Sequence, residues 1–411
     1  MNPNLRRDAD QIITASLAAV QPDAAVRRAL TDFHAEGRVV LVAVGKAAWQ
    51  MAHAAVDCLG SVDGGIVITK YDHSRGEIPG VLCREAGHPV PDEHGYAATA
   101  EALALADSLG EGDTALLLIS GGGSALFEQP LLPPAELEAV TAQLLACGAD
   151  IREMNTIRKR LSAVKGGRFA LRCAPARVFQ IVLSDIVGDP LDMIASGPAC
   201  ADRSTCAEAA AIAARYGLRL SEQASALLRQ ETPKSLCNVE TRITGSVREL
   251  CAAAAAECRK LGYEPMLLTD CLGCEAREAG GFLASVLRTH AADGRRLAFL
   301  AGGETVVHLT GDGLGGRNQE LALAAAAGLD GLAGAAVFSV GSDGTDGPTD
   351  AAGGYVDGET AAALRAAGLD LFDVLRRNDA YHALQAIDGL IVTGPTGTNV
   401  NDVAVGLLRP D

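Results

Sequence analysis

Short apolar runs alternate along almost the whole chain with segments whose apolar residues recur at helical spacing. Runs such as 38–44 and 114–119 consist almost entirely of aliphatic residues, as buried strands of a parallel sheet do. Segments such as 9–33 place apolar residues three and four positions apart, which predicts helices with one buried face. This alternation predicts βαβ units and parallel sheets, and therefore an α/β fold.

The remaining predicted elements follow the same rule. Further strands are predicted at 64–69, 177–183, 264–269, 297–301, 335–340 and 389–392. Helices are predicted from Ala47 onward and at 96–109, 133–147, 204–230, 247–261, 277–291, 319–327, 359–367 and 380–386.

The length of the chain, 411 residues, exceeds what one hydrophobic core usually supports. Thr232-Pro233 is the clearest linker, because proline interrupts the pattern there. We therefore predict two α/β domains, residues 1–235 and 236–411. The pattern leaves open whether the final helix or strand returns to the first domain.

Composition narrows the class of protein. The formal net charge is −16 and the isoelectric point is near 5.0, which argues against broad nucleic-acid binding and against anionic membrane surfaces. No apolar run reaches the roughly 18 residues of a membrane-spanning helix. Acidic residues follow Arg6-Arg7 in place of an apolar signal segment. The expected partner is a small molecule, with the protein a monomer or a homodimer.

The 11 cysteines are scattered at irregular spacing, mostly inside alanine-rich segments. This distribution favours reduced thiols that act as small apolar residues in a cytoplasmic protein. Cys271 and Cys274 form a single CxxC pair, whereas a zinc site needs a second pair of ligands. The eleven thiols are therefore interpreted as structural or incidental.

The loops that follow the predicted strands are unusually uniform in chemistry. They include Gly45-Lys46, the run 120–124, the run 184–190, Gly302-Gly303-Glu304 and the glycine- and aspartate-rich run 341–350. In open α/β sheets, ligands bind beyond the carboxyl ends of the strands. One polar loop of this kind is also what ordinary turns look like, but the recurrence after several strands favours a ligand site.

The stretch 297–320 holds the densest set of such features. Glu304 follows two glycines, and a glycine-rich turn then delivers Arg317 and Asn318 to the start of a helix. Bare backbone allows close approach to a ligand, a helix start offers free N–H groups, and arginine adds a forked cation. The alternative is an ordinary hairpin turn with a surface arginine.

The loop chemistry suggests a phosphorylated ligand and a divalent cation. Ser120, Gly121, Gly122, Gly123 and Ser124 offer successive N–H groups and hydroxyls, as a phosphate-binding loop does. Neither a Walker pattern nor a dinucleotide-binding GxGxxG follows the first strand.

Acids on the glycine-rich loops suit Mg²⁺ held together with nucleotide phosphates, or simply cap turns. We assign Asp185, Asp189 and Asp346 to the metal and Asp343 to the nucleotide, the latter with Gly302, Gly303 and Asn318.

Residues 151–172 carry seven basic residues against one acid, a net charge of +6 in a strongly acidic protein. Either they form a solvated helix face, or they form a rim that steers and binds a polyanion such as ATP. Arg158, Lys165 and Arg168 are the expected contacts, since Gly166-Gly167 keeps the backbone open between the last two.

Lys46 stands at the start of a helix, where the positive end of the helix dipole disfavours a cation. This placement favours a catalytic role as a point charge on a transferring phosphoryl group. His88 lies in a loop between prolines, and for it a structural and a functional role are equally compatible with the sequence.

Eight strings together resemble the glycerate 2-kinases that carry a C-terminal MOFRL domain. They are VGKAA (44–48), GHPVPD (87–92), LISGGGSALFEQP (118–130), MNTIRKRLSAVKGGRFA (154–170), LSDIVGDPLDMIASGP (183–198), AGGETVVHLTGDGLGGRNQE (301–320), GSDGTDGPTDAAGG (341–354) and GPTGTNVNDV (394–403). The resemblance covers nearly the whole chain, and some relatives are labelled hydroxypyruvate reductase.

The resemblance implies a Rossmann-like N-terminal domain, a smaller α/β C-terminal domain and an active site in the cleft between them. It implies ATP and Mg²⁺ as cofactors and phosphorylation of glycerate at its 2-hydroxyl. Lys46 and Arg317 match the family's lysine and arginine of catalysis, and Glu304 is our candidate for activating the hydroxyl. Two alternatives are a hydroxypyruvate reductase using NAD(P)H, which needs a dinucleotide fingerprint this chain lacks, and a non-catalytic sugar-acid sensor.

Overall fold

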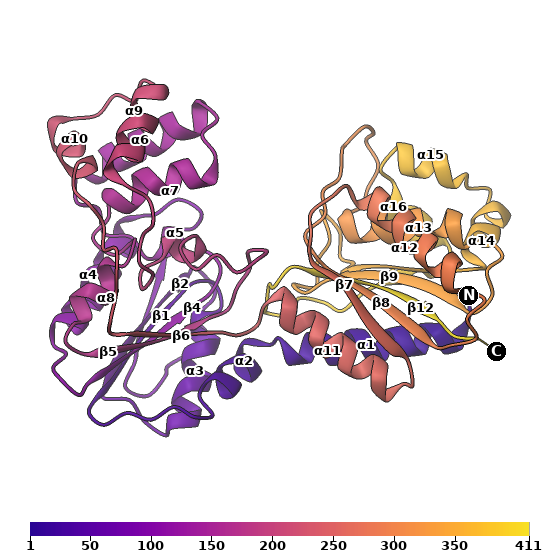
Figure 1. Ribbon diagram of the computed structural model, residues 1–411, viewed down its shortest axis with the longest axis horizontal. Helices are drawn as coiled ribbons and strands as arrows, with labels where there is room; N and C mark the ends of the chain where they lie inside the picture. Colours follow the sequence, from indigo (N-terminus) through magenta and orange to yellow (C-terminus); the bar gives the residue numbers. More distant parts are fainter. Residues whose placement is uncertain (411) are drawn as a thin grey trace. The chain divides into compact units, whose positions relative to one another are not determined.

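The computed structural model describes residues 1–410, which divide into two compact units. The first unit combines residues 1–24, 185–188 and 245–411, and the second combines residues 25–184 and 189–244. Figure 1 shows the secondary-structure elements of both. The N-terminal segment therefore belongs with the C-terminal half of the chain. The chain passes from the second unit to the first between Thr244 and Gly245, and the division into domains at residue 235 stays a prediction.

The second unit is built on a six-stranded sheet in the order β3-β2-β1-β4-β5-β6, and every neighbouring pair is parallel. This is the strand order of the Rossmann fold. The strands are β1 (Val39–Val44), β2 (Gly64–Lys70), β3 (Leu82–Ala86), β4 (Thr114–Ile119), β5 (Arg177–Val182) and β6 (Val239–Ile243). The expected Rossmann-like, mostly parallel N-terminal sheet is confirmed.

Helices cover this sheet, and a helical group extends from it. α3 (Ala48–Leu59), α4 (Glu93–Asp107), α5 (Gly123–Leu126) and α8 (Arg168–Cys173) lie near the strands; α6 (Pro134–Ala146), α7 (Ile151–Arg160), α9 (Cys206–Arg215) and α10 (Glu222–Leu228) group together (Figure 1). This helical group has its own apolar core, which includes Leu137, Leu144, Ile157 and Leu228.

Thr232-Pro233 lies inside the second unit and is not a linker. The Thr232 side chain is buried and its hydroxyl donates to Asp202 Oδ2 at 2.7 Å. The backbone N–H of Asp202 donates to the Pro233 carbonyl at 2.9 Å. The proline interrupts the hydrophobic pattern because it ends the helical group, and the chain then continues into β6.

The first unit is built on a second six-stranded sheet in the order β11-β10-β9-β12-β8-β7. Only β7 and β8 are parallel, so the expectation of parallel sheets along the whole chain is wrong here. The C-terminal strand β12 inserts between β8 and β9 and runs antiparallel to both. The strands are β7 (Glu264–Leu272), β8 (Leu297–Gly303), β9 (Ala335–Gly341), β10 (Gly353–Asp357), β11 (Leu390–Ile391) and β12 (Asp402–Leu408).

Helices cover both faces of this mixed sheet. α1 (Pro3–Ala19) and α11 (Val247–Lys260) pack together on one face (Figure 1). On the other lie α12 (Ala276–His290), α13 (Arg317–Leu329), α14 (Thr360–Ala366), α15 (Leu371–Arg376) and α16 (Ala380–Ala386). α2 (Pro22–Ala29) follows α1 in the chain.

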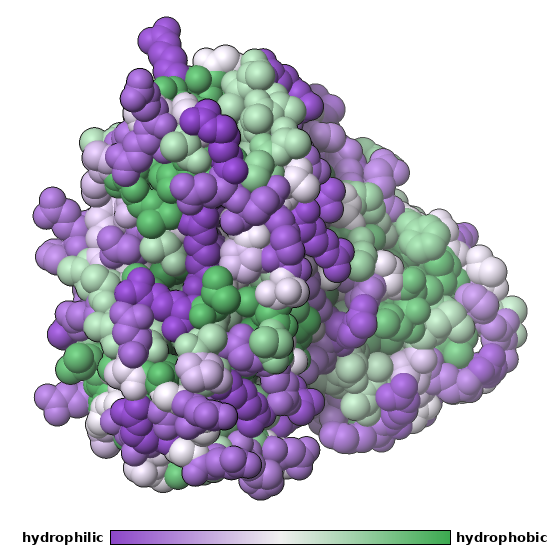
Figure 2. Space-filling view, turned by 60° about the vertical axis from the view of Figure 1, so that its left-hand side comes forward, coloured by the Kyte–Doolittle hydropathy of each residue, from purple (hydrophilic) through white to green (hydrophobic). Residues whose placement is uncertain are grey.

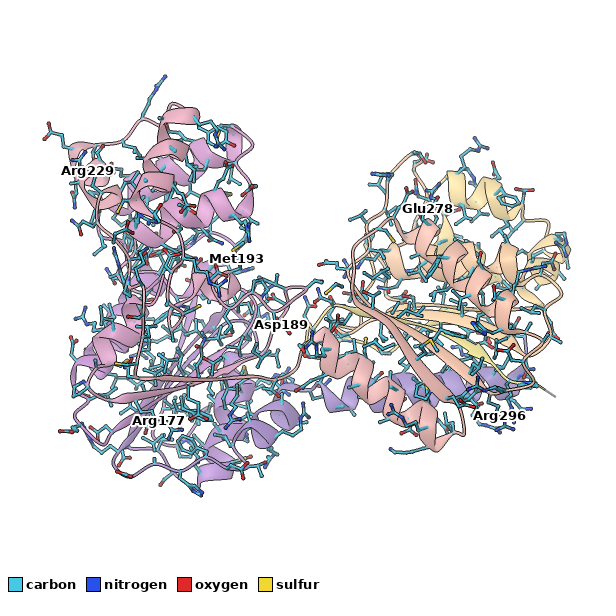
Figure 3. All side chains as sticks on the ribbon, in the orientation of Figure 1. Arg177, Asp189, Met193, Arg229, Glu278 and Arg296 are labelled. Atoms are coloured by element: carbon cyan, nitrogen blue, oxygen red, sulfur yellow. The ribbon has the colours of Figure 1, made fainter. Side chains whose placement is uncertain are left out.

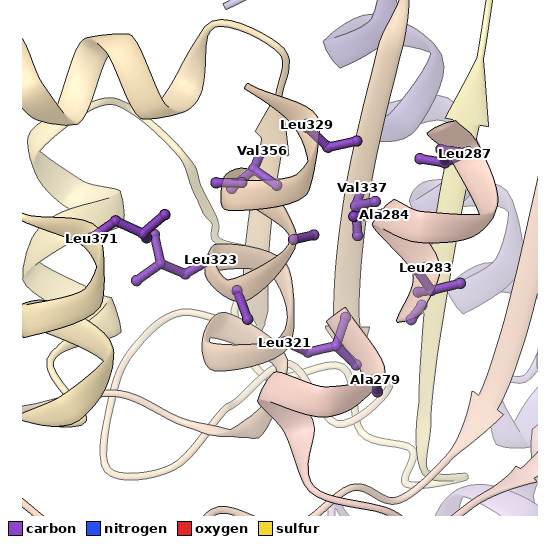
Figure 4. Packing of buried hydrophobic residues seen from close by; sticks show 14 of the residues in the cluster. Ala279, Leu283, Ala284, Leu287, Leu321, Leu323, Leu329, Val337, Val356 and Leu371 are labelled. Carbon is purple, nitrogen blue, oxygen red and sulfur yellow. The ribbon is translucent and has the colours of Figure 1, made fainter. Parts of the chain in front are cut away.

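The core of the first unit fills the space between α12, α13 and the sheet. Figure 4 shows Leu283 and Leu287 of α12 and Leu321 of α13 among its apolar residues. Each fully buried leucine stabilises the fold by about 1.5–3 kcal/mol. Glycine at position 280 allows the two helices to approach closely, because a Cβ there would lie 2.1 Å from the Leu321 carbonyl oxygen. This packing fixes the helix that begins at Arg317.

Buried polar contacts tie α1 into the first unit. Asp8 is 5% exposed, and its Oδ2 accepts hydrogen bonds from the Tyr263 hydroxyl at 2.8 Å and from Arg409 Nη1 at 2.9 Å. These three residues come from the start, the middle and the end of the chain. No sequence pattern predicts these contacts, because each partner is hundreds of residues away from Asp8 in the chain.

On the face shown in Figure 2, hydrophilic residues predominate and hydrophobic residues occur in separate groups. No helix within residues 1–410 is long and apolar enough to cross a membrane.

Candidate functional site

In the second unit, the loop after β1 packs directly on the loop after β4. The Lys46 N–H donates to the Gly121 carbonyl at 2.9 Å, and the Ala47 N–H donates to Ser120 Oγ at 3.0 Å. Gly45 has a φ of +120°, and a Cβ on it would lie 2.3 Å from Ser120 Oγ. Glycine is therefore required at position 45, and it holds Lys46 against the 120–124 loop.

The 120–124 loop is partly buried, and close neighbours surround its glycines. Gly122 has a φ of +88°, and a Cβ on it would lie 3.1 Å from His88 Nε2 and 3.3 Å from Lys46 Cγ. A Cβ on Gly123 would lie 2.7 Å from the Cβ of Ala195. The glycines of this loop are thus explained by close neighbours, and the neighbours include His88, whose role the sequence left open.

Behind the loop, a chain of hydroxyl and amide groups leads to α7. The hydroxyls of Ser124 and Ser196 lie 3.1 Å apart, and Ser196 Oγ donates to Asn155 Oδ1 at 3.0 Å. Ala195 and Ser196 both have φ near +50° to +60°, a conformation that costs a residue with a side chain about 1–3 kcal/mol. Such local strain is typical of positions that serve a site, and Ser196 and Asn155 were not singled out from the sequence.

Residues 151–172 form neither a solvated face nor an open rim, because the cations at their centre are buried. Lys165 is 0% exposed; its ammonium donates to the Ser124 and Phe127 carbonyls, each at 2.9 Å, and pairs with Glu128 at 3.0 Å. Burial lowers the pKa of Lys165 to about 8, although the Glu128 carboxylate opposes the change. Lys165 is therefore placed to hold the 120–124 loop from behind.

The neighbouring cations are engaged in the same way. Lys159 pairs with Asp192 and Asp202, both at 3.3 Å, and the Arg160 side chain is fully buried. Arg158 Nη2 donates to the Ser124 carbonyl at 3.3 Å, and Arg168 Nη1 donates to the Ser162 carbonyl at 2.8 Å. For Lys165 and Arg168 these internal bonds weigh against direct contact with a nucleotide, which stays a prediction.

In the first unit, Arg317 is held by two carboxylates. Its Nε and Nη2 donate to the two oxygens of Asp402 at 2.5 and 3.0 Å, and Nη1 pairs with Glu304 at 3.0 Å. Burial lowers the pKa of Arg317, but the bonds and charges of Asp402 and Glu304 outweigh it and raise the pKa above the ordinary value. Asp402, at the start of β12, is only 6% exposed, and burial raises its pKa.

Asp346 caps the helix that Arg317 begins. Its carboxylate accepts the N–H groups of Asn318 at 3.1 Å and Gln319 at 2.9 Å. A Cβ on Gly316 would lie 2.3 Å from Asp346 Cγ, so this glycine makes room for the cap. Burial raises the pKa of Asp346 to about 6, and the two N–H bonds oppose the shift. The sequence assigned Asp346 to the metal, whereas its oxygens are occupied by the helix.

Other residues assigned from the sequence have structural neighbours of their own. A Cβ on Gly302 would lie 2.4 Å from Cys251 Sγ, and one on Gly303 would lie 2.2 Å from the Leu272 carbonyl oxygen. Both glycines are thus explained by packing within the unit. Asp343 Oδ1 accepts the Thr345 N–H at 3.0 Å, as turn-forming aspartates do.

The two remaining metal candidates differ in their surroundings. The Asp185 carbonyl accepts from Asn401 Nδ2 at 3.2 Å, and the same amide lies 3.3 Å from Glu304 Oε2. Asp189, labelled in Figure 3, has a buried Oδ1 without a hydrogen-bond partner. Among residues 1–410, no three His, Cys, Asp or Glu side chains gather as a metal site would require.

A separate cavity of about 460 Å³ lies in the second unit between α7, α9 and the segment after β5. Asn155 and Met193 line it, and Asn155 Nδ2 lies 3.5 Å from Met193 Sδ. Met193 is labelled in Figure 3. Most of its charged groups are engaged internally, as Lys159 is with Asp192 and Asp202. The cavity shares Asn155 with the chain of groups behind Ser124.

The fold and these loops define a two-domain α/β protein with ligand-type loops at the ends of its strands. Residues 8–229 match a family described as a domain of unknown function (DUF4147), and residues 297–402 match the MOFRL family. The chain belongs to the glycerate 2-kinase family with a C-terminal MOFRL domain.

Individual relatives support this membership. The chain is 50% identical to D-glycerate 2-kinase of Thermotoga maritima over 98% of this chain and 99% of the relative, and 38% identical to glycerate 2-kinase of Pyrococcus horikoshii over 92% and 89%. The crystal structure of a Thermotoga maritima glycerate kinase matches with a TM-score of 0.95 at 49% identity, over 99% of this chain and 100% of that one. An Agrobacterium vitis relative, 41% identical over 97% and 93%, bears the provisional name hydroxypyruvate reductase.

Within each unit, the structure brings together part of what the sequence proposed. Lys46 lies with the 120–124 loop, and Arg317 lies with Glu304. Asp402 and Asn401 were missed as individual residues, although both fall in the polar run 394–403 that follows a predicted strand. Their acid and amide groups next to a strand were the available indication.

Proposed function

We propose that this protein is an ATP-dependent glycerate 2-kinase that converts D-glycerate to 2-phosphoglycerate. The observation that carries the proposal is the free ammonium of Lys46 beside the bare 120–124 loop, in a chain of this family. Among residues 1–410, no hydrogen-bond or ion-pair partner engages the exposed Lys46 Nζ. A cation held this way at a glycine loop suits a phosphate group.

In the proposed reaction, the 2-hydroxyl oxygen of glycerate attacks the γ-phosphorus of MgATP. The bond from that phosphorus to the β–γ bridging oxygen breaks, and ADP leaves with that oxygen. Glu304, half-exposed and bonded to Arg317, accepts the hydroxyl proton. Lys46 and Arg317 stabilise the charge on the moving phosphoryl group, the effect that preorganised cations give.

The residues that hold the parts of MgATP remain proposals. Mg²⁺ bound through nucleotide phosphates needs only one or two protein carboxylates. Of the assigned aspartates, Asp189 fits best because its Oδ1 has no other partner, whereas Asp346 already caps α13. The phosphates are assigned to the backbone and hydroxyls of Ser120 to Ser124, and a cytoplasmic location accords with 11 free cysteines.

Phosphorus NMR of the protein mixed with ATP, Mg²⁺ and D-glycerate tests the proposal. The expected product is 2-phosphoglycerate formed together with ADP. Formation of 3-phosphoglycerate would contradict the assigned hydroxyl, and glycerate binding without ATP consumption would leave the protein a sensor. If the same preparation instead oxidises NADH when hydroxypyruvate is added, as measured by absorbance, the result would favour the reductase.

A further inference from the structure

Four basic side chains gather at one edge of the parallel sheet. Lys46 follows β1, Lys70 ends β2, His73 follows Lys70 by three residues, and His88 follows the end of β3 by two. Because β1, β2 and β3 are parallel neighbours, their carboxyl ends lie at the same edge. We call Lys46, Lys70, His73 and His88 the basic cluster.

Specific contacts order this cluster around Gly122. The His88 ring turns its Cδ2–Nε2 edge toward Gly122, where an added Cβ would lie 3.1 Å from both atoms. The same Cβ would lie 3.3 Å from Lys46 Cγ. His73 Nδ1 lies 3.1 Å from the Lys46 carbonyl oxygen and donates to it, since a carbonyl only accepts. The backbone of Lys46 is thereby fixed while its ammonium stays free.

No acid of the unit neutralises the cluster. Among residues 1–410, neither the Lys46 and Lys70 ammonium groups nor the His88 ring has a hydrogen-bond or ion-pair partner. Of the carboxylates near the cluster, Asp92 accepts from the Tyr71 hydroxyl at 2.6 Å and the Gly95 N–H at 2.9 Å, and Glu85 accepts the Ser74 N–H at 2.9 Å. Asp72, between Lys70 and His73, is exposed and forms no ion pair with the cluster among the residues that the structure describes. In a chain with a formal net charge of −16, two lysine ammonium groups without an acidic partner at one edge of the sheet indicate a site for an anion.

The protonation state of His88 suits it to donate a hydrogen bond without adding charge. Burial lowers its pKa, and the charges of Lys46, Lys70 and His73 lower it further. At neutral pH the ring is therefore uncharged and carries one N–H. Neutral imidazole beside a lysine combines a directional donor with a point charge.

We propose that the basic cluster is a binding site for one oxyanion, with Lys46 supplying charge and His88 a directed hydrogen bond. Two ligands of the proposed kinase carry this chemistry: the carboxylate of glycerate and a phosphate of the nucleotide. The assignment deepens the proposed function and rests on it for the identity of those two ligands, but the site itself rests on the cluster. His88 is then a contact residue, and the absence of a side chain on Gly122 permits His88 and Lys46 to lie close to its backbone.

The first experiment follows the His88 imidazole directly. Wild-type protein with labelled histidine is titrated by NMR in the presence of inorganic phosphate, pyrophosphate or D-glycerate, each added alone, and His88 is assigned by comparison with His88→Gln. A bound anion stabilises the imidazolium and raises the His88 pKa by roughly one unit. The anion that raises the His88 pKa more, phosphate or glycerate, is identified as the ligand. If none of the three moves His88, the proposal is wrong.

The second experiment separates the two sources kinetically. In His88→Gln and His88→Ala, we expect KM for one of glycerate and ATP to rise about 10-fold, the loss of one hydrogen bond to a charged group. A rise for glycerate alone assigns the carboxylate, and a rise for ATP alone assigns a phosphate. His34→Gln is the matched control, because His34 is exposed and precedes β1 at the opposite edge of the sheet.

Outcomes for the site and for the kinase can be told apart. If the His88 variants fold and keep the wild-type KM and kcat for both ligands, the proposed oxyanion site is refuted and the kinase proposal stands. Wild-type protein that makes no 2-phosphoglycerate, yet whose His88 pKa rises with phosphate or glycerate, would remove the kinase proposal while the site stands. If both His88 variants fail to fold, the His88 signal is assigned by elimination from single variants of the seven other histidines, and the wild-type titration then decides.

Discussion

Lys46 in the second unit and Arg317 in the first are the two cations that the sequence assigned to catalysis, and their surroundings differ. The Lys46 ammonium is exposed and unpaired among residues 1–410, whereas the Arg317 guanidinium is two-thirds buried and bonded to Asp402 and Glu304. Lys46 thus keeps its whole charge for a ligand. The charge of Arg317 is already balanced, and what the protein fixes is the direction of its donors.

The difference shows two ways of preparing a cation for an anionic ligand. A free lysine attracts the ligand strongly but costs side-chain entropy when it is ordered. A guanidinium held by a buried carboxylate is ordered before the ligand arrives, and its planar fork keeps the geometry. Mutation of the two residues should therefore have similar effects on catalysis and different effects on stability.

Arg317→Ala should show the largest combined effect. We expect kcat to fall by roughly 100-fold or more, because a positioned charge stabiliser is lost. The free energy of unfolding should also fall by about 1–3 kcal/mol, since Asp402 is left buried without its partner. Steady-state kinetics and urea unfolding measure the two effects, and unchanged stability would contradict the structural part.

Lys165→Met tests whether a buried cation acts through structure. Removing the ammonium leaves Glu128, which is 0% exposed, without its ion-pair partner, and we expect a loss of about 3–5 kcal/mol in unfolding free energy. The double variant Lys165→Met with Glu128→Leu should recover most of that loss. If the double variant regains stability but KM for ATP stays strongly raised, Lys165 contacts the nucleotide after all.

Lys46→Ala should affect catalysis alone. We expect kcat to fall by roughly 100-fold, with a melting temperature within error of the wild type, because the ammonium makes no contact that folding depends on. Calorimetry and turnover on the same preparation check both statements. A large loss of stability would contradict the proposed difference between Lys46 and Arg317. Turnover equal to that of the wild type would show that Lys46 has no catalytic role.

The smallest expected effect is a pH dependence from Asp346. Burial raises its pKa from 3.8 to about 6, so the folded state binds the proton more tightly than the unfolded state does. The contribution of this group to stability is therefore greatest below pH 4 and is lost as pH rises through 6, and about 2 kcal/mol of this loss falls between pH 4.5 and 6.5. Urea unfolding of wild type and Asp346→Asn between pH 4.5 and 6.5 should show a flatter profile in the variant; parallel profiles would refute the assignment.

The sequence by itself determined the elements whose cause is local. Aliphatic runs specified β1, β4 and β5 because strands buried on both faces need apolar residues at every position. Glycine and polar runs at strand ends located the loops at 120–124 and 302–317, since only such residues allow sharp turns and exposed N–H groups there. The family motifs lie in the same loops, so the Rossmann-like domain could be predicted from the sequence, whereas the catalytic roles of Lys46 and Arg317 stay predictions.

Tertiary structure decided everything that depends on a distant partner. β12 lies between β8 and β9, α1 packs in the first unit, and Lys165, expected to contact a polyanion, is buried beneath the 120–124 loop. The carboxylate of Asp402 bonds Arg317 from 85 residues away, and His88 and Lys46 both lie next to Gly122, although β2 separates their strands. A charged or glycine-rich segment has the same sequence pattern whether it is exposed or buried. Its desolvation and its ion pairs depend on neighbours in space, which the sequence pattern does not contain.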